Sequence, residues 1–222
     1  MNLDEFKKEF VRQELGIGDN FPEVFSFIDF GNVNYWFDDD RQTHDHIALA
    51  EEERLCIDIE KLDQFLSIFS KTVRFYYGHD SANTKSLGFI RVARDIFGKH
   101  AVSTKPIQKV RHHLLSPEEL TSNTRTLFHD DMGDYVFLPK CNFDVEISVD
   151  AIKLLDNYDT FCLLSSDADF VHLLRYLKSK KKKIILIKGG PVVHDLKDIA
   201  DLVVNAQDIK KHISLIKQKP GI

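Results

Sequence analysis

The chain has 222 residues, enough for one sizeable hydrophobic core, and its 43% hydrophobic and 29% charged residues are typical of a soluble globular protein. Its net charge of −5 excludes a globally basic surface, so any binding of nucleic acid requires a local patch. No apolar run is long enough to cross a bilayer, and the charged, amphipathic start shows no secretory signal. The three cysteines are scattered without metal-ligand spacing and indicate free thiols, so we expect a cytoplasmic protein.

The first half of the chain alternates between helical and strand patterns. An amphipathic helix is predicted up to Leu15, and the apolar run at 24–30, which contains Asp29 near its end, predicts a buried parallel strand. Residues 38–46 are polar and acidic and indicate a loop. The pattern then predicts a helix at 59–69, a strand at 72–78, a helix at 86–99 and a strand at 101–107.

The second half begins with the weakest pattern of the chain. Residues 108–139 are predicted to form an irregular insertion, with a local helix start at 116–119 and a turn at 129–134. Strands that alternate with helices predict a parallel sheet covered on both faces. We therefore expect a helical extension over 1–20 and a single α/β domain over 21–222. The pattern after the insertion predicts a helix at 143–157, a strand at 160–165, a helix at 169–180, a strand at 183–188, a short helix at 193–199, a strand at 201–205 and a final helix.

Four aspartates stand where this fold would bring them together. Ligands of an open parallel sheet bind beyond the carboxyl ends of its strands, where Asp29 ends one strand and Asp167 and Asp169 follow another. Asp144 lies in the first turn of the 143–157 helix, near the middle of its apolar face. Asp150 falls on the opposite face of that helix, which we predict to be solvated.

Each of these acids also has an ordinary structural explanation. Asp167 or Asp169 could cap the helix that follows, and Asp144 could interact favourably with its helix dipole. Two carboxylates so close together repel, however, and a divalent cation is the commonest remedy. Carboxylates without histidine or cysteine partners prefer Mg²⁺ or Mn²⁺, which activate water for attack on phosphoryl groups. Asn32 could orient one of these groups or serve as an ordinary turn residue.

Other candidate residues carry weaker patterns. The histidines, including His112 and His113, lack a partner at ligand spacing, and solvent exposure explains them. The lysine run at 178–183 suits a helix end, or it forms a phosphate-contacting patch with Lys181 and Lys182. Such a patch would be helped by Lys105, Lys109 and Arg111.

Two blocks of the sequence resemble the NYN domain of the PIN-like nuclease superfamily, in its LabA-like branch. In that family the first strand ends in an aspartate with an asparagine three residues on, matched here by Asp29 and Asn32 in "FIDFGNV". A lysine precedes a helix that carries two aspartates, matched by Lys140, Asp144 and Asp150 in "KCNFDVEISVDAI".

A third block, "LLSSDADFVHLLRYLKSKKKKIILI", strengthens the resemblance. The family usually reads S-G-D-S-D-F at this point, and the acids of that motif are all kept here. Ser166 stands in place of the glycine and Ala168 in place of the second serine. The matching residues are Ser165, Asp167, Asp169 and Phe170.

The resemblance implies a PIN-like three-layer α/β/α sandwich with a mainly parallel sheet, and metal-dependent cleavage of RNA, which we expect to be single-stranded. Two other functions stay open: a non-catalytic RNA-binding or regulatory protein with a relic of the acidic pocket, and a metal-dependent phosphohydrolase. A homodimer also stays open, and no membrane partner is expected. The expected catalytic residues are Asp29, Asp144, Asp167, Asp169 and Asn32, with the four aspartates as ligands of Mg²⁺ or Mn²⁺. The expected substrate-binding residues are Lys140, Ser165, Lys181 and Lys182.

Overall fold

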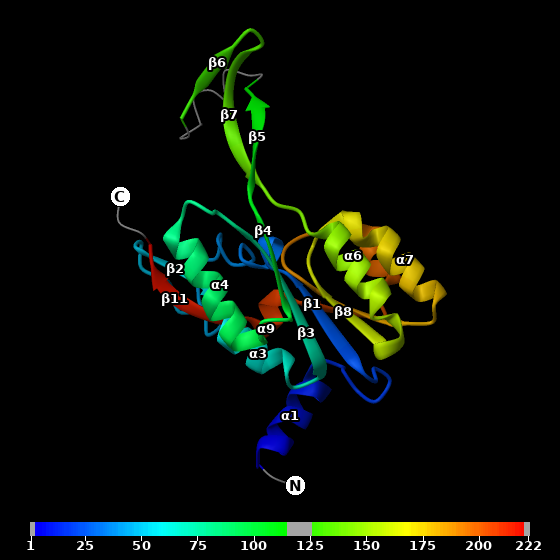
Figure 1. The fold of residues 1–222 in the computed structure, drawn as a ribbon. Coiled ribbons are helices and arrows are strands. Elements are labelled where there is room, and N and C mark those ends of the chain that lie inside the picture. Colours follow the sequence, from blue (N-terminus) through cyan, green and yellow to red (C-terminus); the bar gives the residue numbers. More distant parts are fainter. Residues whose placement is uncertain (1–2, 115–125, 220–222) are drawn as a thin grey trace.

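A sheet of six parallel strands forms the centre of the computed structural model, which describes residues 3–114 and 126–219 (Figure 1). Its two middle strands are buried at every position, as expected of parallel strands covered on both faces. The strands, in spatial order, are β10 (Leu202–Asn205), β9 (Lys183–Lys188), β8 (Thr160–Leu164), β1 (Val24–Asp29), β3 (Ser70–His79) and β4 (Val102–Pro106).

Helices cover both faces of this sheet, and each face has its own hydrophobic cluster. Neighbouring residues of β1 point to opposite faces, so that Ile28 belongs to one cluster and Phe27 to the other. One face is covered by α2 (Phe30–Val33), α3 (Ile59–Leu66), α4 (Thr84–Phe97) and α9 (Ala206–Ile213). The other is covered by α6 (Asp144–Lys153), α7 (Val171–Ser179) and α8 (His194–Ile199), with short 3₁₀ turns η1 (Leu155–Asn157) and η2 (Ala168–Phe170).

The three layers confirm the predicted α/β/α sandwich. Side-chain caps fix where several of its helices begin, because Asp58, Asn83 and Asn205 accept hydrogen bonds from the first backbone N–H groups of α3, α4 and α9. The helix α1 (Leu3–Glu14) extends beyond the amino edge of the sheet (Figure 1). Within the described residues, no helix is both long and apolar enough to span a bilayer.

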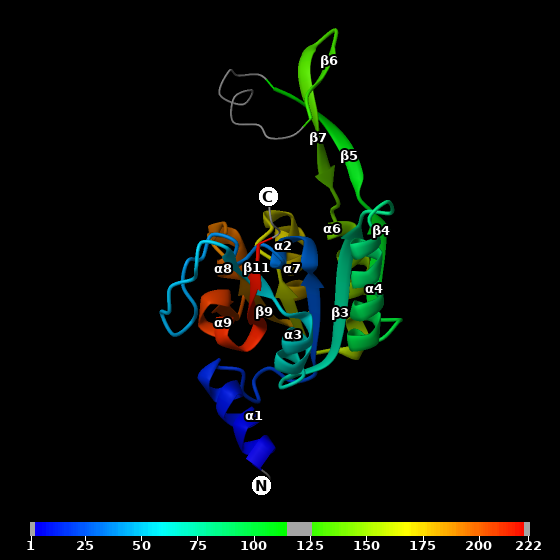
Figure 2. The ribbon, with the colours of Figure 1, turned by 90° about the vertical axis from the view of Figure 1, so that its left-hand side faces the viewer.

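Residues 108–114 and 126–140 form a projecting arm, and these described parts are more regular than the irregular insertion predicted for 108–139. Its three antiparallel strands are β5 (Gln108–His113), β7 (Gly133–Lys140) and β6 (Phe128–Asp130), in that spatial order. Figures 1 and 2 show the arm rising beyond the carboxyl edge of the parallel sheet. β5 is exposed at nearly every position, so it lacks the alternation that reveals a half-buried strand. The helix start predicted at 116–119 lies outside the described residues.

A second small sheet was also not predicted. β2 (Glu53–Ile57) pairs antiparallel with β11 (Ser214–Gln218), so the predicted final helix ends at Ile213 and the chain continues as a strand. The 143–157 helix is likewise divided into α6 and η1. The other predicted helices and strands occur within a few residues of their expected ends.

Candidate functional site: an acidic cluster at the carboxyl edge

Three aspartates meet at the carboxyl edge of the sheet. Asp167 and Asp169 lie just beyond the end of β8, and Asp144 is the first residue of α6. Each contributes one carboxylate oxygen that lies within 4.8 Å of the corresponding oxygens of the other two. The predicted inward orientation of Asp144 therefore agrees with the structure.

The turn after β8 serves both the local fold and the cluster. Asp167 Oδ1 accepts a hydrogen bond of 3.0 Å from the backbone N–H of Asp169, which caps η2. Both the capping explanation and the clustering explanation therefore hold for Asp167. Asp169 itself is exposed, so the cluster opens to solvent on its side.

One carboxylate oxygen of Asp144 has no hydrogen-bond partner within the described residues. Its Oδ1 is buried and forms no hydrogen bond within the described part of the chain. Burial raises the pKa of Asp144, and the negative charges of Asp167 and Asp169 raise it further. A buried acceptor without a donor is costly, and two neighbouring carboxylates make it costlier. An all-oxygen donor set of this kind fits a hard divalent cation such as Mg²⁺ or Mn²⁺.

Asp29 lies beside this group without belonging to it. Its side chain is 8% exposed, and its Oδ2 accepts a hydrogen bond of 3.0 Å from Ser165 Oγ. Burial raises its pKa to about 6, Asp144 and Asp167 raise it as well, and the bond from Ser165 opposes the shift. The charge of the cluster therefore affects the pKa of Asp29, while the role of Asp29 as a metal ligand stays a prediction.

Ser165 is a supporting residue within the site. It is fully buried, so its position does not fit the predicted contact with substrate. Its hydroxyl donates to Asp29 and accepts a hydrogen bond of 3.2 Å from the backbone N–H of Asp167. It therefore links the end of β1 to the turn after β8.

Asn32 fixes the same turn from α2. Its Oδ1 accepts hydrogen bonds from Trp36 Nε1 at 3.0 Å and from the backbone N–H of Ser166 at 3.1 Å. The Ser166 hydroxyl then donates to the carbonyl of Gly189 at 2.6 Å and accepts from its N–H at 3.1 Å. A Cβ on Gly189 would lie 2.3 Å from Trp36 Cδ1, so only glycine fits there. The serine that replaces the usual glycine of the motif therefore ties the turn to the end of β9.

The prediction that Asp150 faces solvent is wrong. Its Oδ2 accepts hydrogen bonds from Arg74 at 2.9 Å and from the Tyr76 hydroxyl at 2.8 Å, which anchor α6 to β3. The apolar residues spread over a broad face of this helix, and its buried part, which includes Ile147 and Ala151, lies closer to Asp150 than the predicted centre did. Of the apolar residues, Val145 is 73% exposed, whereas Ile147 is fully buried.

The three lysines that were predicted to bind substrate lie in two different parts of the structure. Lys140 ends β7, four residues before Asp144, and is exposed with no ion pair within the described residues. Lys181 and Lys182 precede β9 and therefore lie at the amino edge of the sheet, away from the acids. Lys182 Nζ also donates to the carbonyl of Tyr158 at 2.6 Å, so it has an internal role.

Lys105 was expected only as a helper of the lysine run, but it lies beside the acids. Its Nζ donates to Glu146 Oε1 at 2.6 Å and lies 4.6 Å from the centre of the Phe143 ring. Its positive charge lowers the pKa of Asp144, against the dominant effect of burial. The signal that could have revealed it is its place near the end of a parallel strand.

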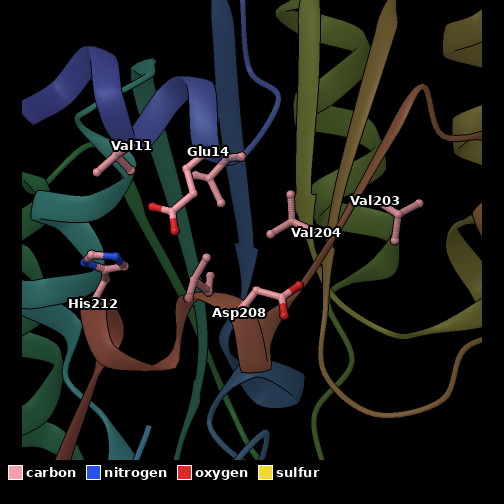
Figure 3. Close-up of a pocket in the computed structure, with 8 residues that line it drawn as sticks. Val11, Glu14, Val203, Val204, Asp208 and His212 are labelled. Carbon is pink, nitrogen blue, oxygen red and sulfur yellow. The ribbon is translucent and has the colours of Figure 1, made fainter. Parts of the chain in front are cut away.

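A separate hollow of about 250 Å³ lies between α1, β10 and α9 (Figure 3). Glu14 reaches it from α1, and Asp208 and His212 reach it from α9. Burial lowers the pKa of His212, which favours its neutral form. The three side chains do not form a metal-binding group within the described residues, and the hollow shares no residue with the acidic cluster.

Fold and site together define a PIN-like α/β/α domain with an acidic cluster, and comparisons with known proteins agree. The NYN domain family matches residues 24–206. LabA, the low amplitude and bright protein of Synechococcus elongatus, is 28% identical over 87 residues, which are 39% of this chain and 47% of LabA. An uncharacterized protein of Methanocaldococcus jannaschii is 41% identical over 64 residues, 28% of this chain and 27% of that protein. The chain thus aligns with less than half the length of either relative.

A solved structure has the same fold. A Vibrio parahaemolyticus protein of unknown function superimposes with a TM-score of 0.56 at 18% identity, over 89% of this chain and 99% of that chain. The chain belongs to the NYN domain family of the PIN-like nuclease superfamily, and its similarity to LabA supports the LabA-like branch.

Proposed function

We propose that this protein is a ribonuclease that hydrolyses phosphodiester bonds of single-stranded RNA with Mg²⁺ or Mn²⁺. The observation that carries the proposal is the group of three carboxylates in which a buried oxygen of Asp144 lacks any donor within the described residues. Asp144, Asp167 and Asp169 would hold the ion, which relieves their repulsion. When bound, such an ion polarises the scissile phosphate and lowers the pKa of water.

Other residues would position this group and its substrate. Asp29 adds a negative charge beside the cluster, and Asn32 fixes the turn that carries Asp167. Lys140 is an exposed cation four residues before Asp144 in the chain and would contact a phosphate of the substrate. Binding of RNA through such contacts weakens as salt rises. Lys181 lies at the other edge of the sheet and would not contact a phosphate held at the acidic cluster.

The test is single-turnover cleavage of a labelled single-stranded RNA in Mn²⁺, in Mg²⁺ and in chelator. Wild-type protein should cleave only with the metal, and Asp144→Asn should lower the rate by at least about a hundredfold, since it removes a ligand charge. Asp156→Asn is the matched control, because Asp156 is an exposed acid in η1 at the far end of α6, and it should cleave like wild type.

Each alternative gives a different result in the same assay. Full activity in chelator, or in Asp144→Asn, would refute a nuclease that uses this cluster. Binding of RNA without cleavage under any metal condition would indicate a non-catalytic RNA-binding protein. Hydrolysis of a phosphomonoester panel with intact RNA would indicate a phosphohydrolase.

A further inference from the structure

A hollow of about 280 Å³ separates α2 from the base of the arm. The rings of Phe30 and Tyr77 line it, 6.0 Å apart between centroids. Ile107, which directly precedes β5, and Pro139 of β7 line it at the base of the arm. Asn34 and Tyr35, which follow α2, complete its lining.

Two residues that line this hollow, Tyr35 and Asn34, are exposed to solvent. Tyr35 is 64% exposed, although burying a tyrosine ring is favourable. The side chains of Asn34 and Tyr35 form no hydrogen bond within the described residues. A hollow with aromatic walls, a free ring and a free amide suits a planar heterocycle that can stack and also form hydrogen bonds along its edge.

Two glycines connect this hollow to the acidic site. Gly31 lines the hollow, and a Cβ at that position would lie 3.5 Å from Asp29 Oδ1. At Gly78, a Cβ would lie 2.6 Å from Cys141 Sγ, so only glycine lets the chain after the arm pack against β3. Cys141 therefore closes one side of the hollow, three residues before Asp144. The hollow therefore lies beside Asp29, whose pKa is in turn raised by the charges of Asp144 and Asp167.

An adjoining hollow extends the same path toward α4. It has a volume of about 290 Å³, shares Phe30, Asn34 and Tyr77 with the first, and adds Lys85. Lys85 is exposed and forms no ion pair within the described part of the chain. An exposed cation beside these hollows suits contact with a phosphate of a nucleic acid strand.

We propose that the hollow between α2 and the arm binds the base of the nucleotide next to the scissile phosphate. Tyr35 stacks on this base, Asn34 contacts its edge, and Lys85 receives a phosphate farther along the strand. The proposal rests on the proposed function, because it takes the acidic cluster as the place of the scissile phosphate. A base held in this way cannot be paired, so the substrate is single-stranded at that nucleotide.

The test uses a fluorescently labelled single-stranded RNA of about twelve nucleotides, together with versions that carry one abasic residue at successive positions. Cleavage is measured as kcat/KM with Mn²⁺, and binding is measured by anisotropy with Asp144→Asn protein. One abasic position beside the cleaved bond should lower both quantities by about 5- to 100-fold, the range for loss of one base–aromatic stack. Tyr35→Ala should cause a similar loss with intact RNA and no further loss with the abasic RNA, because the two changes remove the same contact.

The control is Tyr176→Ala, which removes a 38% exposed tyrosine from α7 and should behave like wild type. Cleavage that is insensitive to every abasic position and to Tyr35→Ala would overturn the base site and leave the nuclease proposal intact. Position-specific binding that depends on Tyr35, without cleavage by wild type, would support the base site and reject the nuclease. Failure of wild-type protein to bind or cleave the RNA would overturn both.

Discussion

Asp29→Asn should stabilise the metal-free protein at neutral pH, although it alters a buried residue of the site. In the folded protein the pKa of Asp29 is raised from 3.8 to about 6, mainly by burial. The native state therefore holds this proton more tightly than the unfolded state, and stability falls as pH rises from about 4 to about 7. The difference corresponds to about 3 kcal/mol at neutral pH. Asparagine removes the charge and keeps an oxygen that can accept from Ser165.

The assay is urea unfolding in chelator, with the free energy of unfolding of variant and wild type compared from about pH 4.5 to about pH 7.5. The variant should be more stable by about 1–3 kcal/mol at the higher pH, and the difference in free energy of unfolding, variant minus wild type, should be lower by about 2 kcal/mol at the lower pH. Taking the difference cancels the groups that titrate in both proteins. Asp156→Asn serves as the control, because Asp156 is exposed and its substitution should show no such pH dependence.

A difference that stays constant across this pH range would refute the reasoning, whatever its sign. It would mean that Asp29 has the same pKa in the folded and unfolded states. A difference, variant minus wild type, that becomes smaller as pH rises would refute it more strongly. In that case the carboxylate would be stabilised by its surroundings, and burial would not dominate.

Three further predictions follow from the contacts of the site. Saturating Mn²⁺ should raise the Tm of wild type, and Asp144→Asn should remove most of the gain; an equal shift in both would place the ion elsewhere. Tyr76→Phe should lower the free energy of unfolding by about 1–2 kcal/mol in urea, since it removes a donor to the Asp150 carboxylate; no loss would mean that Arg74 suffices. Ser166→Gly should lower the free energy of unfolding by about 1–2 kcal/mol through its two bonds to Gly189, and an unchanged Tm would contradict this.

The sequence predicts most of the parallel sheet because its strands are short apolar runs with sharp ends. The end of such a run is a strong signal, so the positions of Asp29 and Asp167 at one edge follow from the alternation of strands and helices alone. The orientation of Asp144 follows less directly, from the phase of its helix. The strands of the arm cannot be predicted in this way. β5 is exposed on both sides, so it has no buried face to produce an alternation of apolar and polar residues.

The roles of individual side chains are harder to predict, because they depend on partners that are distant in sequence. Asp150 bonds to Arg74 and Tyr76 across 76 and 74 residues, and no local pattern signals these contacts. Asn32 was recognised as a site residue, but its bonds to Trp36 and Ser166 appear only in three dimensions. The sequence therefore identified Asn32 as a site residue, and the structure shows that it holds the turn after β8 in place.

The central place of β1 has a consequence for the order in which the molecule can be assembled. β1 is made first, yet it lies between β3 and β8, and the bond between Asp29 and Ser165 spans 136 residues. A ribosome needs on the order of 10 s to add that much chain. During this time β1, an apolar strand, can pair with β3 along one edge only. Its other edge stays unpaired and can form hydrogen bonds with a non-native strand. The acidic site is therefore completed only after β8 has been inserted beside β1, and a nascent chain that stops short of the turn after β8 cannot form it.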